Sequence, residues 1–133
     1  MPLADEISAA GLTPAMRRVL ARALRGVAAA DGPIGEAEER AIRAMLGGDD
    51  SLDGAQREPI ESIWPHAELC VRACVHLALV DGDYRVEEAR AVGQVAHRLG
   101  LSAPRLATIE RQVFRFLRSV AARRSRTGPP PLR

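Results

Sequence analysis

Apolar residues recur every three or four positions along most of the chain. In the clearest stretch these residues are Met16, Leu20, Leu24 and Val27, which would share one face of a helix. No stretch alternates apolar and polar residues with an excess of β-branched types, as a half-buried strand would. The pattern therefore predicts an all-α fold.

Helix caps and breakers divide this pattern into separate helices. Thr13 followed by Pro14 is typical of a helix start, and Gly47 and Gly100 are typical of helix ends. The predicted helices span roughly residues 14–30, 36–46, 65–80, 86–99 and 103–122, with a shorter one around residues 60–64.

The length of 133 residues fits a single domain. We expect this helical domain to cover residues 12–122, after an N-terminal segment over residues 1–11. Residues 123–133 are basic and proline-rich, and we expect them to form a disordered tail.

Residues 17–46 and 67–96 repeat one pattern, fifty positions apart. Identical residues at matching positions include Asp31 and Asp81, Gly32 and Gly82, and Glu38 and Glu88. Each copy is predicted to form a helix, a tight Asp-Gly turn and a second helix. The sequence thus predicts a single-domain helical bundle of two pseudo-repeated helix–turn–helix hairpins plus a C-terminal helix.

The repeated glutamates have a structural interpretation. If the second helix of each hairpin begins after Gly35 or Arg85, then Glu38 and Glu88 occupy the third helical position. A carboxylate there can accept a hydrogen bond from the backbone N–H of the capping residue. We favour this capping role for both glutamates.

The doubled motif reads Ala30-Asp31-Gly32-x-Ile34-x-x-x-Glu38 and Val80-Asp81-Gly82-x-Tyr84-x-x-x-Glu88, and the sequence HRLGLS follows at 97–102. Over roughly residues 12–122 this pattern resembles the bacterial TerB-like family, which includes the tellurite-resistance protein TerB and the N-terminal domain of DjlA-type co-chaperones. Arg85 departs from the small polar cap usual there, and the loop 47–59 matches nothing in the family.

The resemblance implies an all-helical, non-enzymatic module that acts in tellurite resistance or other stress responses. It also implies a scaffolding or metal-sensing part in membrane-associated complexes. We therefore expect a protein partner, which the sequence does not identify.

Acidic residues of the two turns are candidate ligands for a divalent cation. If the hairpins pair, their carboxylate oxygens could converge on one ion. Capping and solvation are the favoured alternative. The candidate metal-binding residues are Asp31, Glu38, Asp81, Asp83 and Glu88.

His66, Cys70 and Cys74 follow one another at four-residue spacing on one helix face, which suits a soft metal. The repeat, however, aligns them with the apolar stripe of the first helix. Buried cysteine behaves as a small apolar residue, so we favour core packing for both thiols.

Charge is unevenly distributed along the chain. Residues 1–100 contain 11 Arg against 16 acidic residues, whereas residues 101–133 contain 8 Arg against Glu110 alone. Arg111, Arg115 and Arg118 form a stripe opposite the apolar face of the last helix. This stripe could contact an anionic membrane or a nucleic acid, or it could simply be solvated. Nucleic acid is not favoured, because only Phe114 lies near enough to stack on a base.

Composition argues against several kinds of chemistry. All 19 basic residues are arginine, so no lysine can bind a nucleotide phosphate or form a Schiff base. No set of nucleophile, base and orienting residue is recognisable, so we expect no enzymatic activity. No apolar stretch is long enough to span a membrane. Asp5 and Glu6 precede every arginine, unlike in a signal peptide, and we expect a cytoplasmic protein with reduced thiols.

Overall fold

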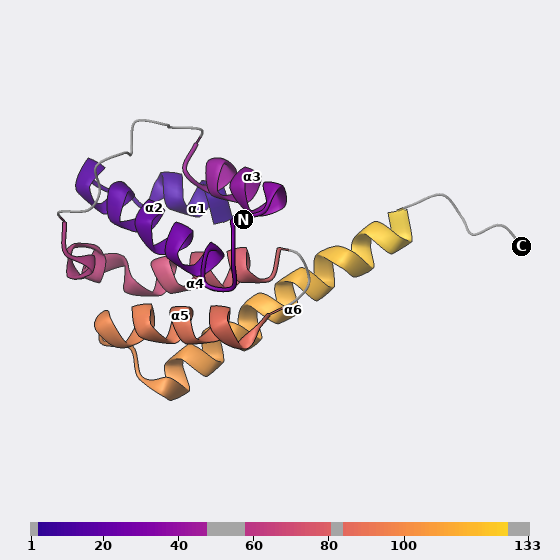
Figure 1. Ribbon diagram of the computed structural model, residues 1–133. Coiled ribbons are helices and arrows are strands. Elements are labelled where there is room, and N and C mark those ends of the chain that lie inside the picture. Colours follow the sequence, from indigo (N-terminus) through magenta and orange to yellow (C-terminus); the bar gives the residue numbers. More distant parts are fainter. Residues whose placement is uncertain (1–2, 48–57, 81–83, 128–133) are drawn as a thin grey trace, which may run out of the picture.

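The structure is a computed structural model that describes residues 3–47, 58–80 and 84–127, the last seven of these for their backbone only. The described residues form six α-helices and one 3₁₀ helix, and no strand occurs among them (Figure 1). The helices are α1 (Leu3–Ala9), α2 (Pro14–Ala28), α3 (Glu36–Met45), η2 (Ile60–His66), α4 (Ala67–Ala78), α5 (Val86–Arg98) and α6 (Ala103–Thr127). The predicted all-α class is confirmed.

Helix α4 lies at the centre of the bundle. It packs against α2, α3, η2, α5 and α6, while α1 packs against α3. In Figure 1, α5 runs along the side of α4 that faces away from α2 and α3. Helix α6 starts close to α5 and then projects out of the bundle. None of the helices in the described part of the chain is long and apolar enough to cross a bilayer.

Helices α2, α3 and α5 begin where the sequence predicts, each with a local capping hydrogen bond. The Thr13 hydroxyl oxygen accepts a bond from the Met16 N–H at 3.1 Å, and Pro14 opens α2. The Gly35 N–H donates to Glu38 Oε1 at 3.4 Å, and the Arg85 N–H donates to Glu88 Oε1 at 3.2 Å. The predicted capping role of both glutamates is confirmed.

Matching positions of the two sequence copies are buried alike. Several pairs aligned at an offset of fifty have both members almost fully inaccessible, including Leu20 and Cys70, Leu24 and Cys74, Val27 and Leu77, and Ile42 and Val92. Because a helix buries one stripe of side chains, the shared pattern puts the same stripe of each copy into the core.

The N-terminal segment contains a helix that the sequence analysis did not predict. Ile7 of α1 is only 1% exposed, and Glu6 Oε2 lies 2.6 Å from Arg72 Nη2 of α4. A seven-residue helix has little stability by itself, so packing and this ion pair must hold it. Residues 3–9 thus belong to the helical bundle.

Two helix boundaries also differ from the prediction. Helix α4 begins at Ala67, because Pro65 is taken up by the 3₁₀ helix η2 that precedes it. Helix α6 continues to Thr127, so residues 123–127 of the predicted tail are helical. Arginine is among the best helix formers, and three of these five residues are arginine. The remainder of the tail, 128–133, lies outside the described residues.

Truncation of the central apolar side chains should test this core. Leu24 and Leu77 are at most 1% exposed, so we expect Leu24→Ala and Leu77→Ala each to lower the free energy of unfolding by ~2–5 kcal/mol. Val86→Ala is a control, because Val86 is 61% exposed. Urea denaturation measures all three, and unchanged midpoints for both leucine variants would contradict the packing described above.

Candidate functional site

The first Asp-Gly turn lies beside the start of α5. Asp31 Oδ2 is 3.5 Å from Arg85 Nε, and Arg85 is the residue that caps α5. This ion pair joins the turn of the first sequence copy to the segment that follows the turn of the second. Asp81, Gly82 and Asp83 lie outside the described residues.

Arg85 changes the electrostatics of the predicted cation site. Its guanidinium already brings a positive charge to Asp31, which opposes a metal ion at the same carboxylate. Glu38 and Glu88 each use one carboxylate oxygen to cap a helix. No group of three or more His, Cys, Asp or Glu side chains that could hold a metal ion occurs in the described part of the chain. Asp81 and Asp83 lie outside that part.

The two thiols lie inside the core. Cys70 and Cys74 are fully buried, whereas His66 belongs to η2 and is only partly buried. A hydrogen bond with Cys70, together with burial, raises the pKa of the Cys74 thiol well above its usual range. Cys74 therefore stays protonated at neutral pH and is a poor nucleophile and metal ligand.

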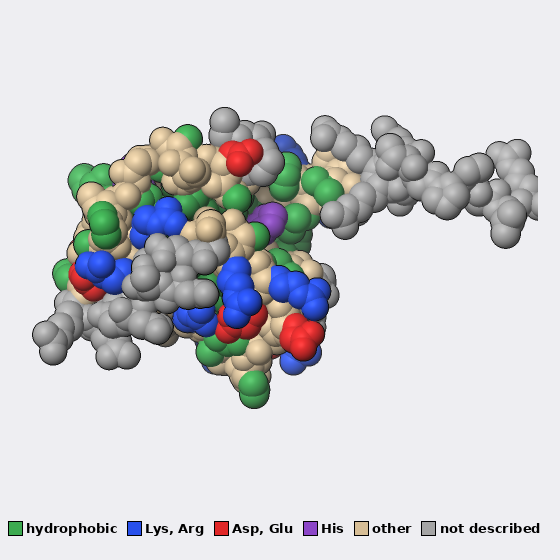
Figure 2. Space-filling model, turned by 90° about the horizontal axis from the view of Figure 1, so that it is seen from above, with side chains coloured by type: hydrophobic (Ala, Val, Ile, Leu, Met, Phe, Trp, Pro, Cys, Tyr) green, Lys and Arg blue, Asp and Glu red, His purple; other side chains and the backbone are tan. Residues whose placement is uncertain are grey.

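The predicted arginine stripe of α6 is exposed. Arg111, Arg115 and Arg118 form no ion pair with any described residue, and Arg111 donates only to the Thr108 hydroxyl. Elsewhere, arginines of the bundle pair with acidic side chains, as the adjacent blue and red groups in Figure 2 illustrate. Such pairs are Arg18–Glu58, Arg25–Glu39, Arg40–Glu36, Arg72–Glu6, Arg98–Glu61 and Arg105–Glu68.

An aromatic side chain lies within this stripe. Phe114 is 40% exposed and meets the Tyr84 ring edge-on, with centroids 6.1 Å apart. The Tyr84 hydroxyl donates to Glu110 Oε2 at 2.7 Å, and burial, with this carboxylate, raises the pKa of Tyr84 well above its usual range. The three arginines and Phe114 line a shallow depression of about 410 Å³.

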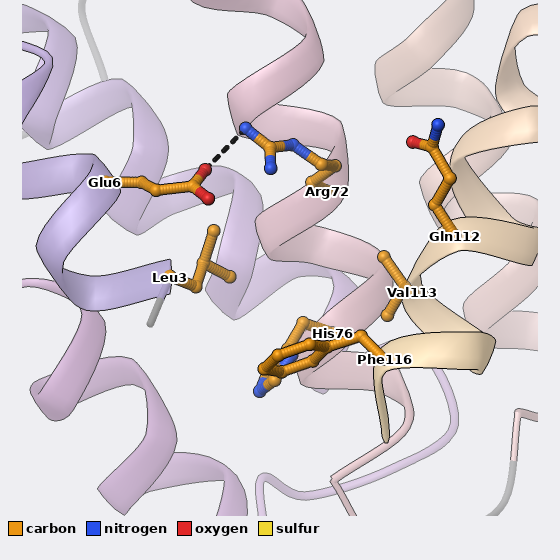
Figure 3. Close-up of a pocket in the computed structure, with 7 residues that line it drawn as sticks. All are labelled: Leu3, Glu6, Arg72, His76, Gln112, Val113 and Phe116. Atoms are coloured by element: carbon orange, nitrogen blue, oxygen red, sulfur yellow. Dashed lines mark ion pairs between the residues drawn. The ribbon is translucent and has the colours of Figure 1, made fainter. Parts of the chain in front are cut away.

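A second hollow lies between α1, α4 and α6. It measures about 150 Å³ and is lined by Leu3, Glu6, Arg72, His76, Gln112, Val113 and Phe116 (Figure 3). The ion pair of Glu6 and Arg72 occupies one end, so these two charges neutralise each other. Burial lowers the pKa of His76, whose ring contacts Phe116. The sequence analysis missed this hollow because it predicted no helix before residue 12.

Comparison with known proteins gives no match to any protein-family model, curated protein or solved structure. The resemblance to the TerB-like family therefore rests on the sequence motif alone.

The buried thiols generate a prediction about reactivity. We expect Cys70 and Cys74 to resist a thiol reagent in the native protein and to react rapidly after denaturation, because the reagent must reach a thiolate. A colorimetric thiol titration with and without denaturant measures this. Fast labelling of both thiols in the native state would contradict their place in the core.

The Asp31–Arg85 ion pair generates a prediction about metal ions. A cation that binds only the folded state at ~100 times its Kd would add ~2.7 kcal/mol of stability. Because Arg85 already neutralises Asp31, we expect the same melting temperature in Ca²⁺, Mg²⁺ or chelator. A rise with cation that Asp31→Asn and Asp81→Asn both abolish would instead support the cation site.

Proposed function

We propose that this chain is a non-enzymatic interaction or scaffold module of the TerB-like type, with the arginine stripe of α6 as its contact face. The observation that carries the proposal is that Arg111, Arg115 and Arg118 are exposed and have no acidic partner among the described residues. A role in stress response, tellurite resistance included, is the part of the proposal that rests on the resemblance.

The architecture in this proposal is a pair of helix–turn–helix hairpins related by a pseudo-two-fold axis. Three observations support it. Glu38 and Glu88 cap corresponding helices, matching apolar positions of the two copies are buried, and Asp31 is ion-paired with Arg85. The last of these places the first turn beside the start of α5.

Helix energetics favour a partner for the stripe. Arg111 and Arg115 are four residues apart, and Arg115 and Arg118 are three apart, so their charges repel along one face. Each such like-charge pair destabilises a helix by about 0.2–0.5 kcal/mol. An anionic partner would remove this repulsion, and arginine binds carboxylates in a two-pronged geometry.

An acidic protein surface is the partner that we propose. The stripe is exposed, and Phe114 between the arginines adds an apolar anchor of the kind found in protein interfaces. An anionic membrane surface is the alternative, and nucleic acid has less support because Phe114 is the sole aromatic side chain lining the depression.

The stripe can be tested with a matched pair of triple variants. R111Q/R115Q/R118Q should bind fluorescent polyglutamate about tenfold more weakly than wild type, since exposed ion pairs contribute roughly 0.2–1 kcal/mol each. R25Q/R40Q/R98Q removes the same charge from arginines that already have acidic partners, and it should bind nearly as wild type does. Glutamine is a good helix former, so circular dichroism should be unchanged.

Fluorescence anisotropy measures these affinities. Equal losses in the two variants would mean that only net charge matters and would refute the stripe as the contact face. Sedimentation with vesicles that contain phosphatidylglycerol tests the alternative. Tighter binding to the vesicles than to polyglutamate would replace the acidic protein by a membrane as the partner.

A further inference from the structure

Trp64 is the most exposed large apolar side chain in the described part of the chain, at 65%. It is also the sole tryptophan of the sequence. Tryptophan is costly to expose to water and is enriched among the residues that dominate binding energy in protein interfaces. We therefore expect a binding partner to cover Trp64 at the surface of η2.

The surroundings of Trp64 form a shallow depression. It measures about 550 Å³, and its lining includes Pro65, Leu69 and Leu101 from the end of η2, from α4 and from the segment before α6. The Trp64 indole N–H makes no hydrogen bond to any described residue. The depression thus offers a flat apolar ring next to an available N–H donor.

This combination suits a polyproline II segment. Such a segment has no internal hydrogen bonds, so its carbonyl oxygens can accept bonds, and its proline rings pack on aromatic side chains. The chain contains such a sequence itself, since residues 129–131 are three consecutive prolines. In the sequence, one residue, Gly128, separates them from the last residue of α6, and they lie outside the described residues.

The number of residues between α6 and the prolines determines whether they can contact Trp64 of the same copy of the chain. Helix α6 begins two residues after Leu101, which lines the depression, and its 25 residues rise ~1.5 Å each, or about 37 Å in all. From Thr127 an extended chain covers at most about 14 Å to Pro131 and about 20 Å to Arg133. Figure 1 shows α6 ending on the opposite side of the molecule from η2. The prolines cannot reach Trp64 of their own chain.

We propose that residues 129–131 of one copy bind across Trp64 of a second copy and so link copies head to tail. Charge favours this direction, because residues 101–133 are strongly basic and residues 1–100 are acidic. Such a contact joins two different surfaces, so repetition gives a ring or an open chain of copies. The proposal does not depend on the partner of the arginine stripe.

Trp64 itself reports the contact, because no other tryptophan contributes to the emission. In a dilution series of the full chain, the emission should move to shorter wavelength as concentration rises, since the indole leaves water. Light scattering on the same samples should show an increase in mass. P129A/P130A/P131A should abolish both changes, and Trp64→Ala should move the increase in mass to about 30-fold higher concentration.

The controls separate this contact from other ways to associate. Phe116→Ala removes an exposed aromatic side chain away from η2, and it should associate like wild type. A peptide TGPPPLR added to P129A/P130A/P131A should restore the shift in emission, whereas TGAAALR should not. Loss of Trp64 should weaken association about 30-fold, the factor expected for a dominant interface residue worth ~2 kcal/mol.

Three results would overturn the proposal. The first is association of P129A/P130A/P131A or Trp64→Ala with the same strength as wild type. The second is an equal response to the two peptides, which would show that proline is not recognised. The third is the absence of self-association in wild type, whether or not the peptide binds, because a second copy would then not be the occupant. Circular dichroism of each variant confirms that α6 and the bundle stay folded.

Discussion

The burial of α4 on nearly all sides is the constraint on which the rest of the structure depends. Its inaccessible side chains include Cys70, Ala73, Cys74 and Ala78, which are small. Small side chains allow neighbouring helices to approach closely, since the distance between packed helices follows the size of the residues at the contact. One helix of 12 residues can therefore position α2, α3, η2, α5 and α6 around it.

Helix α6 is longer than the helices that it packs against, so part of it is exposed. Ile109 and Val113 are buried in the bundle, but α6 has 25 residues whereas α4 and α5 have 12 and 13. The C-terminal part of α6 therefore extends beyond the helices that it packs against, and Phe116 is 45% exposed. This mismatch carries the C-terminal end of α6 away from η2 (Figure 1).

Electrostatics at the first turn show how one arginine changes what a motif can bind. The Asp-Gly pattern by itself allows a cation between carboxylates, but the helix cap that follows the second turn is Arg85. Its guanidinium faces Asp31 and supplies a positive charge there. Glu38 and Glu88 meanwhile serve as caps. Asp31, Glu38 and Glu88 thus have structural roles, as an ion-pair partner and as helix caps.

The sequence by itself determined the features that depend on local chemistry: the all-α class, most helix boundaries, the glutamate caps and the exposed arginine stripe. Periodicity and capping act within a few residues, so they can be read from neighbours in the chain. Only the tertiary structure decided the rest. Helix α1 exists because Ile7 and the ion pair of Glu6 with Arg72 hold it against distant helices. The partner of Asp31, the contact of Phe114 with Tyr84 and the exposure of Trp64 likewise depend on residues far apart in the chain, and no local pattern encodes such distances.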